Sequence, residues 1–111
     1  MILRALVAGL MAASTLVPFV ANAQSVPYAD AIYAAADYYG VSGDWLVNVM
    51  ECESGGDPYA VNPDTGDSGL FQFRPQTYYD NGGTNLWDPY EQIWVAAQMF
   101  SEGQSYQWLC A

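Results

Sequence analysis

Apolar residues recur at helical spacing along much of the chain after residue 27. The first such stretch covers residues 28–39 and is followed by Gly40, a residue type that commonly ends a helix. Its shared face consists of Ile32, Ala35, Ala36 and Tyr39. A second helix is expected from Ser42, a good N-cap residue, to about residue 53 or 54, where Gly55 and Gly56 follow. The pattern therefore predicts two consecutive helices joined by a short turn.

The second half of the chain adds two more helices after a stretch rich in turn-forming residues. Residues 57–68 contain Pro, Gly, Asp and Asn and predict a loop or a small turn-rich lobe. Residues 69–73 alternate too briefly to distinguish a strand from the opening turn of a helix. A short helix is expected at residues 75–79. Residues 88–91 read Asp-Pro-Tyr-Glu, the spacing of a capping box with Pro at the first helical position, and predict a last helix to about residue 102.

The first 23 residues differ in character from the rest. Arg4 precedes a long apolar run, which ends in the small-residue sequence Ala-Asn-Ala. A transmembrane anchor is the competing interpretation, but the run is short and contains Pro18. We therefore expect residues 1–23 to be a signal peptide. Residues 24–111 would then form one exported domain, secreted or periplasmic in the cell envelope, with no stable membrane insertion after cleavage.

Cys52 and Cys110 are the only cysteines of the chain. A domain this small is marginal for a core without a covalent staple, and two cysteines in an exported chain usually pair. Closing a loop of that length would contribute roughly 4 kcal/mol in the chain-entropy model. Two free thiols are the alternative. We expect neither a metal nor a cofactor, because the chain has no His and thiolate sites use more ligands.

The exported part is strongly acidic. All twelve Asp and Glu residues lie after residue 23, where Arg74 is the only basic residue, so one positive charge against twelve negative gives a formal net charge of −11. Nucleic acid is therefore not an expected partner, and adhesion to an anionic membrane surface is disfavoured. A neutral or weakly charged polymer fits better, since Tyr and Trp side chains offer flat faces for sugar rings.

Glu53 continues the apolar stripe of the second expected helix. Leu46, Val49 and Met50 precede it at helical spacing, whereas Glu51 is turned about 200° away, toward solvent. Burial beside these side chains and the negative end of the helix dipole should raise the pKa of Glu53. A carboxylic acid that stays protonated near neutral pH is suited to glycosidic bond cleavage. The alternative is a helix-end acid that nearby backbone donors satisfy.

Two sequence stretches carry a resemblance to a known family. Residues 53–63 read Glu-Ser-Gly-Gly-Asp-Pro-Tyr-Ala-Val-Asn-Pro, and residues 69–72 read Gly-Leu-Phe-Gln. In this combination the chain resembles the SLT-type lytic transglycosylase domain of the lysozyme-like superfamily, over about residues 30–110. Cys52 before the acid, and Trp-Leu-Cys near the end, are similar to the resuscitation-promoting factors, a compact secreted branch. The chain departs from the larger transglycosylases at Gln92, often Asn there, and in lacking their Tyr-Asn-Ala-Gly segment.

The resemblance implies a mainly α (α+β lysozyme-like) domain of about four helices, with a short turn-rich or β-like lobe beside an active-site cleft. It also implies peptidoglycan glycan strands as the substrate, Glu53 as the catalytic acid/base, and Ser54 and Gln72 as residues that hold the substrate. The other expected substrate-binding residues are Phe71, Tyr59, Asp67 and Tyr78. Alternatives remain: Ser54 could merely end the helix, Gln72 could be a structural hydrogen-bonding residue, and Tyr59, Tyr78 and Trp87 could each be a sugar platform or part of the core.

The expected reaction is cleavage of the MurNAc to GlcNAc β-1,4 bond by one carboxylate. We expect the protein to be a monomer. Asp64 and Asp67 are the only nearby candidates for a second acid. A lytic transglycosylase would leave an anhydro-muramyl end and a muramidase-type hydrolase a reducing end, and the sequence leaves this choice open. The alternative function is a catalytically idle peptidoglycan-binding or signalling module of the same fold. A calcium site in the Asx-rich loop is disfavoured, because no acid stands at the required final ligand position.

Overall fold

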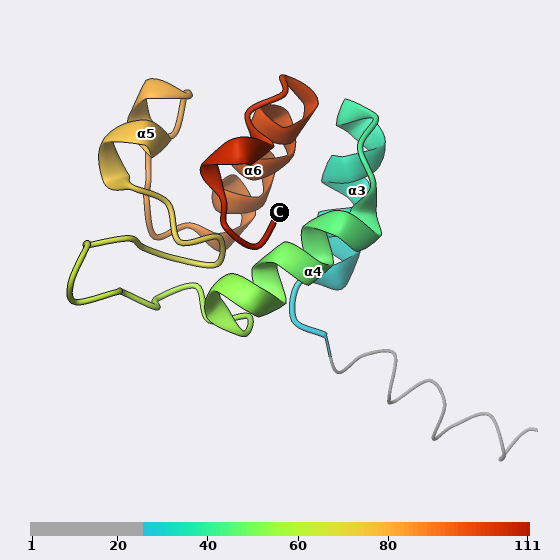
Figure 1. The fold of residues 1–111 in the computed structure, drawn as a ribbon. Helices are drawn as coiled ribbons and strands as arrows, with labels where there is room; N and C mark the ends of the chain where they lie inside the picture. Colours follow the sequence, from blue (N-terminus) through green and yellow to red (C-terminus); the bar gives the residue numbers. More distant parts are fainter. Residues whose placement is uncertain (1–25) are drawn as a thin grey trace, which may run out of the picture.

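Four α-helices and one short 3-10 helix follow one another along residues 26–111, the part of the chain that this computed structural model describes (Figure 1). They are α3 (Ala29–Tyr39), α4 (Gly43–Ser54), α5 (Pro75–Asp80), α6 (Pro89–Ser101) and η1 (Ser105–Gln107). The signal peptide expected at residues 1–23 lies outside the described residues. None of the helices described is long and apolar enough to cross a membrane. The mainly helical class expected from the sequence is confirmed.

The helix ends lie where the sequence places them, because local capping groups fix them. Gly40 ends α3 and Gly55 ends α4, both with a positive φ that glycine adopts without strain. The Ser42 hydroxyl accepts a hydrogen bond from the Trp45 amide at the start of α4. Asp88 does the same for two amides at the start of α6. These local interactions explain why periodicity and capping residues were enough to locate the helices.

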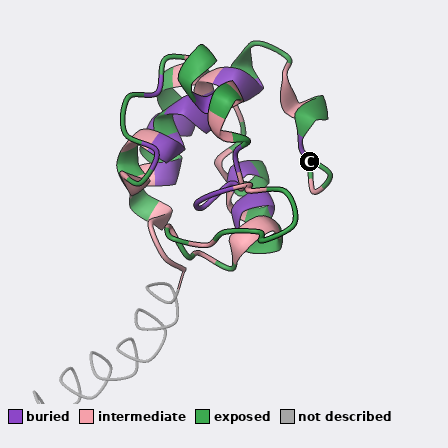
Figure 2. Ribbon diagram, turned by 90° about the vertical axis from the view of Figure 1, so that its left-hand side faces the viewer, coloured by how far each residue is buried: buried purple, intermediate pink, exposed green. Residues whose placement is uncertain are grey.

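The apolar faces of the helices meet in one core, in which α3 packs against both α4 and α6. Figure 2 shows the buried positions on the facing sides of these helices. On these three helices the fully buried apolar residues are Ile32, Ala35, Ala36, Leu46, Val49, Met50, Ile93, Ala96, Ala97 and Met99. The apolar stripes predicted for the first two helices therefore lie in this core. Because the stripe of α4 is buried, the orientation of its last turn is fixed.

Residues 57–73 form the turn-rich lobe, with isolated bridges and no named strand among the described residues. Ser68 and Phe73 exchange two backbone hydrogen bonds, of 2.9 and 2.8 Å, around a tight turn. Residues 69–73 are therefore neither a strand nor the opening turn of a helix, the two forms that their sequence left open. Gly69 sits so close to α6 that a Cβ there would lie 2.7 Å from the side chain of Gln92. Only glycine fits at this close approach.

Gln92 is the buried residue of α6 that ties the lobe to the helices. Its Oε1 accepts a hydrogen bond from the Leu70 amide at 2.8 Å. Its Nε2 donates to the carbonyls of Leu86, at 2.7 Å, and Pro58, at 3.3 Å. The Gln92 side chain thus satisfies three backbone groups at once.

After α6 the chain crosses back between α6 and α4, where the C-terminus lies (Figure 1). Trp108 is buried there, donates its indole N–H to the Phe71 carbonyl at 2.7 Å, and packs on Phe73. The predicted disulfide between Cys52 and Cys110 is present and joins this C-terminal segment, residues 103–111, to the last turn of α4. The segment therefore lies against the end of the helix that carries Glu53.

Candidate active site

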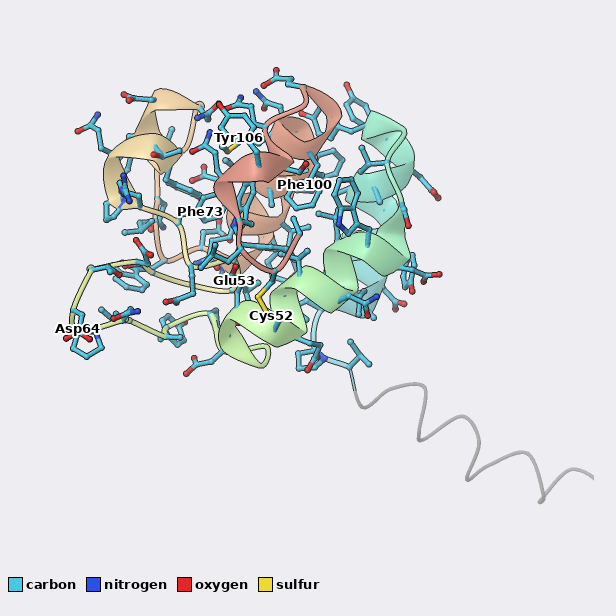
Figure 3. The ribbon with its side chains drawn as sticks, in the orientation of Figure 1. Cys52, Glu53, Asp64, Phe73, Phe100 and Tyr106 are labelled. Atoms are coloured by element: carbon cyan, nitrogen blue, oxygen red, sulfur yellow. A yellow bond between two sulfur atoms is a disulfide. The ribbon has the colours of Figure 1, made fainter. Side chains whose placement is uncertain are left out.

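Glu53 lies in the last turn of α4, half-buried, and the three apolar residues that precede it on the same face are fully buried. Glu51, two residues earlier, is exposed, as the helical spacing predicts. Figure 3 shows Glu53 beside the disulfide at Cys52, within the space between α4, the lobe and the C-terminal segment. Two neighbouring carboxylates of one helix thus have opposite surroundings.

The surroundings of Glu53 favour its protonated form. Burial raises its pKa most, the backbone amide of Cys110 opposes this by favouring the carboxylate, and the negative charge of Asp67 raises the pKa further. The direction agrees with the sequence prediction. Asp67 was one of the two acids expected near Glu53, but the amide of Cys110 was not foreseen, because it depends on how the C-terminal segment folds back onto α4.

A pocket of about 230 Å³ lies between the lobe, α5, α6 and the C-terminal segment. Its wall is formed by Asp67, Gln72, Phe73, Arg74, Thr77, Met99, Gln107 and Trp108. Glu53 is not part of this wall, but its carboxylate is close enough to Asp67 to feel that charge, and Cys110 follows Trp108 by two residues. The pocket is therefore walled on the lobe side, as expected, and no residue of α4 lines it; its other walls are α5, α6 and the C-terminal segment. Sequence reasoning missed these three walls.

Asp67 and Gln72 stand at the side of the pocket nearest the lobe. One carboxylate oxygen of Asp67, Oδ1, is buried and has no hydrogen-bond partner among the described residues. Gln72 has a positive φ of 51°, and its Nε2 donates to the carbonyls of Ala60 and Gly69, both at 3.0 Å. Its Oε1 accepts no hydrogen bond from residues 26–111, so the side chain is fixed through its nitrogen and keeps a free acceptor.

A family model described as Transglycosylase SLT domain matches residues 30–107. The chain belongs to this family. Membership supports lytic transglycosylase-type cleavage of peptidoglycan at the level of the family, and it confirms the resemblance that residues 53–63 and 69–72 carry. The single disulfide is the part of the resuscitation-promoting-factor resemblance that the structure bears out. Comparisons with curated proteins and with solved structures found no match.

Ser54 of this SLT domain makes hydrogen bonds within its own helix end. Its hydroxyl donates to the Met50 carbonyl at 3.3 Å and accepts from the Gly56 amide at 3.1 Å. These are the contacts of a residue that helps to end a helix. Ser54 therefore fixes the turn directly after Glu53.

The aromatic candidates separate into two groups. Phe71 and Tyr78 are fully buried, so neither offers a face to a sugar ring. Tyr59 and Trp87 are exposed, and their ring centroids lie 6.4 Å apart with an interplanar angle of 35°. This second pair forms a continuous aromatic surface at the edge of the lobe.

Asp64 lies at the tip of the lobe, where its amide donates to the Asn62 side chain at 2.9 Å (Figure 3). Figure 3 shows it pointing outward, away from Glu53. Of the two acids considered beside Glu53, Asp67 is therefore the one that the fold brings to the site. Residues 26–111 contain no group of three or more His, Cys, Asp or Glu side chains that could hold a metal ion.

Glu91 has a role that the capping-box spacing did not predict. Its carboxylate accepts hydrogen bonds from the Tyr78 hydroxyl, from the Thr84 amide and hydroxyl, and from the Asn85 amide, at 2.7 to 2.8 Å. The Asp88 amide, the partner expected of a capping box, instead donates to the Asn85 carbonyl at 3.1 Å. Burial alone would raise the pKa of Glu91, but these donors outweigh it and lower the pKa to about 2. Glu91 therefore fixes the loop between α5 and α6.

Proposed function

We propose that this SLT domain cleaves the β-1,4 bond between MurNAc and GlcNAc in peptidoglycan glycan strands, with Glu53 as the only catalytic carboxylate. The observation that supports this most is the half-buried position of Glu53 near Asp67, a wall residue of the pocket, because both burial and that charge favour the protonated acid. An acid in that state can donate a proton to the oxygen of a glycosidic bond.

The reaction has two proton transfers, and the carboxyl group of Glu53 takes part in both. In the first, Glu53 donates its proton to the glycosidic oxygen as the C1–O bond breaks and positive charge develops on the MurNAc ring. In the second, the Glu53 carboxylate takes the proton of the C6 hydroxyl, whose oxygen bonds to C1. The products are a 1,6-anhydro-MurNAc end and a free GlcNAc hydroxyl, and Glu53 is protonated again.

The neighbouring residues assist in different ways. We assign Asp67 two tasks: its charge adds to the effect of burial in raising the pKa of Glu53, and its unpartnered Oδ1 accepts a hydrogen bond from a sugar hydroxyl or acetamido N–H. Gln72 offers a second fixed acceptor. Tyr59 and Trp87 give a flat surface for a sugar ring at the edge of the lobe. Ser54 positions Glu53 by holding the end of α4.

The proposal places this chemistry outside the cytoplasm, where peptidoglycan is found. It includes cleavage of residues 1–23 as a signal peptide and a monomeric domain of residues 24–111. The disulfide between Cys52 and Cys110 suits an oxidising compartment.

The test is zymography and soluble turnover on purified cell wall with Glu53→Gln. We expect a loss of about 10² to 10⁴ in rate, the contribution of positioned proton transfer. Glu51→Gln is the matched control, because it makes the same change on an exposed residue of the same helix, and it should keep full activity.

The products identify the reaction. Mass analysis should find anhydro-muramyl ends, whereas reducing ends would indicate a muramidase-type hydrolase. A wild-type protein that binds the wall and never clears it would contradict the proposal and favour the idle binding module. Full activity of Glu53→Gln would remove Glu53 from the mechanism.

A further inference from the structure

Arg74 stands out among the pocket residues because of its charge. It is the only basic residue after residue 23, in a part of the chain that carries twelve acids. It nevertheless forms no ion pair with a carboxylate of residues 26–111, although one wall of the same pocket is Asp67. The single positive charge of the described residues therefore lies at the wall of the pocket that Asp67 also lines, and it has no ion-pair partner among residues 26–111.

The side chain of Arg74 has no structural task that would explain its position. Arg74 is the N-cap residue of α5, but it makes no side-chain capping hydrogen bond. The helix uses only its backbone carbonyl, which accepts from the Tyr78 amide at 3.1 Å. The guanidinium is exposed, so its five N–H donors are open to a ligand.

We propose that Arg74 binds a carboxylate of the glycan substrate and makes this site selective for carboxylate-bearing strands over neutral ones; the inference rests on the proposed function. Guanidinium and carboxylate groups match in geometry and form charge-assisted, often paired, hydrogen bonds. Without Arg74 the pocket would present only the charge of Asp67, in a protein whose other charges repel anions. Gln72, Thr77 and Gln107 add uncharged polar groups around it.

Peptidoglycan has two sources of such a carboxylate. In a peptide-free strand, the lactyl group of MurNAc ends in a free carboxylate. In a strand that carries stem peptides, the lactyl group is bound as an amide, and the carboxylates lie on the peptide. A strand of GlcNAc alone has neither and serves as the neutral reference.

The experiment measures binding of these three tetrasaccharides by calorimetry to the purified protein carrying Glu53→Gln, so that the ligands are not cut. Adding Arg74→Gln should weaken binding of carboxylate-bearing ligands by about 5- to 30-fold, the range of a charge-assisted hydrogen bond in a partly open site. Binding of the GlcNAc tetrasaccharide should change by less than about 2-fold, since surface substitutions away from a contact have small effects. Loss for the peptide-bearing ligand alone identifies a stem carboxylate, and loss for the peptide-free ligand alone identifies the lactyl group.

Two further variants separate recognition from side effects. Arg74→Lys keeps the charge and should recover a large part of the affinity, which a merely structural role would not predict. Asn48→Asp makes the same change in net charge on the exposed side of α4, and should leave all three affinities unchanged. Circular dichroism confirms that each variant is folded.

The outcomes distinguish this inference from the proposed function. Equal binding of all three ligands with and without Arg74, or an equal loss for all three in Arg74→Gln, would overturn the role of Arg74 alone. Failure of the folded Glu53→Gln protein to bind any of the ligands would overturn the proposed function and the inference together.

Discussion

Glu53 and Glu91 are two half-buried glutamates at opposite kinds of helix end, and their surroundings drive them in opposite directions. Burial raises the pKa of both. Glu91, in the first turn of α6, accepts four hydrogen bonds, and its pKa falls to about 2. Glu53, in the last turn of α4, has one opposing backbone amide, and Asp67 adds to the effect of burial. The number of donors that reach the carboxylate, more than burial, therefore decides which form is favoured.

The helix dipole reinforces the pKa shift of each glutamate. The positive N-terminal end of α6 favours a charged Glu91, and the negative C-terminal end of α4 favours a neutral Glu53. The two sites also differ in how they are assembled. All partners of Glu91 lie within residues 78–85, whereas those of Glu53 come from residues 67 and 110. The site of Glu91 is built locally, and the site of Glu53, the proposed catalytic acid, depends on long-range packing.

Removing the disulfide should have the largest effect, and it should disturb the site of Glu53 while leaving the site of Glu91 intact. Replacing Cys52 and Cys110 by Ala should lower the free energy of unfolding by roughly 4 kcal/mol, because the closed loop is long. Denaturant unfolding measures this, and a loss below about 1 kcal/mol would show that the link is dispensable. In protein that remains folded, the rate of cell-wall clearing should fall, because the C-terminal segment is no longer linked to the end of α4 beside Glu53. The hydrogen bonds of Glu91 should persist in NMR spectra.

Glu91→Gln should have the next largest effect, and on stability rather than on chemistry. A neutral amide cannot accept from all four donors, so unfolding should become easier by about 2 kcal/mol. Glu51→Gln is the control for the same change on an exposed residue, with an expected effect near zero. A Glu91→Gln protein as stable as the wild type would mean that its hydrogen bonds do not hold the loop between α5 and α6.

The pH dependence of the free energy of unfolding in acid should also reveal the contribution of Glu91. The folded pKa of Glu91, about 2, lies below its ordinary value of 4.5, so the unfolded chain takes up this proton first as pH falls. Its contribution is fully present above about pH 4.5 and is lost as pH falls toward 2. Thermal unfolding across this window should show a shallower loss in Glu91→Gln than in the wild type. Equal slopes would contradict the assignment.

Asp67→Asn should have the smallest effect, a shift of the pH profile. Removing the nearby charge lets Glu53 ionise more readily, so its pKa falls. Because Glu53 must be protonated to act as the acid, the alkaline side of the activity profile should move to lower pH. Asp64→Asn, at the tip of the lobe, makes the same charge change and should leave the profile in place. A profile that does not move in Asp67→Asn would separate Asp67 from the titration of Glu53.

The parts of the molecule that the sequence could predict are those fixed by neighbouring residues. Ser42, Gly55 and Asp88 act within one helical turn, so the helix ends followed from their positions. The apolar stripe that turns Glu53 inward and Glu51 outward is equally local. Pairing of the two cysteines followed from their being the only ones.

The rest depends on contacts between distant segments. Nothing near Trp108 indicates that its indole reaches the Phe71 carbonyl, or that the chain end would form a wall of the pocket. Tyr78 carries the same side chain as Tyr59, and only packing decides that one is buried and the other exposed. Glu91 fitted a capping box, but the loop before it offers more donors than the single Asp88 amide.

The most direct test of the central claim is an NMR titration of the side-chain carboxyl carbons of Glu53 and Glu91 in one sample. The account predicts that Glu53 titrates above the ordinary value of 4.5, and that Glu91 stays ionised until the pH approaches 2. Glu53→Gln identifies the first signal by its absence. Titration of Glu53 at or below 4.5 would contradict the claim that this site raises the pKa of its acid.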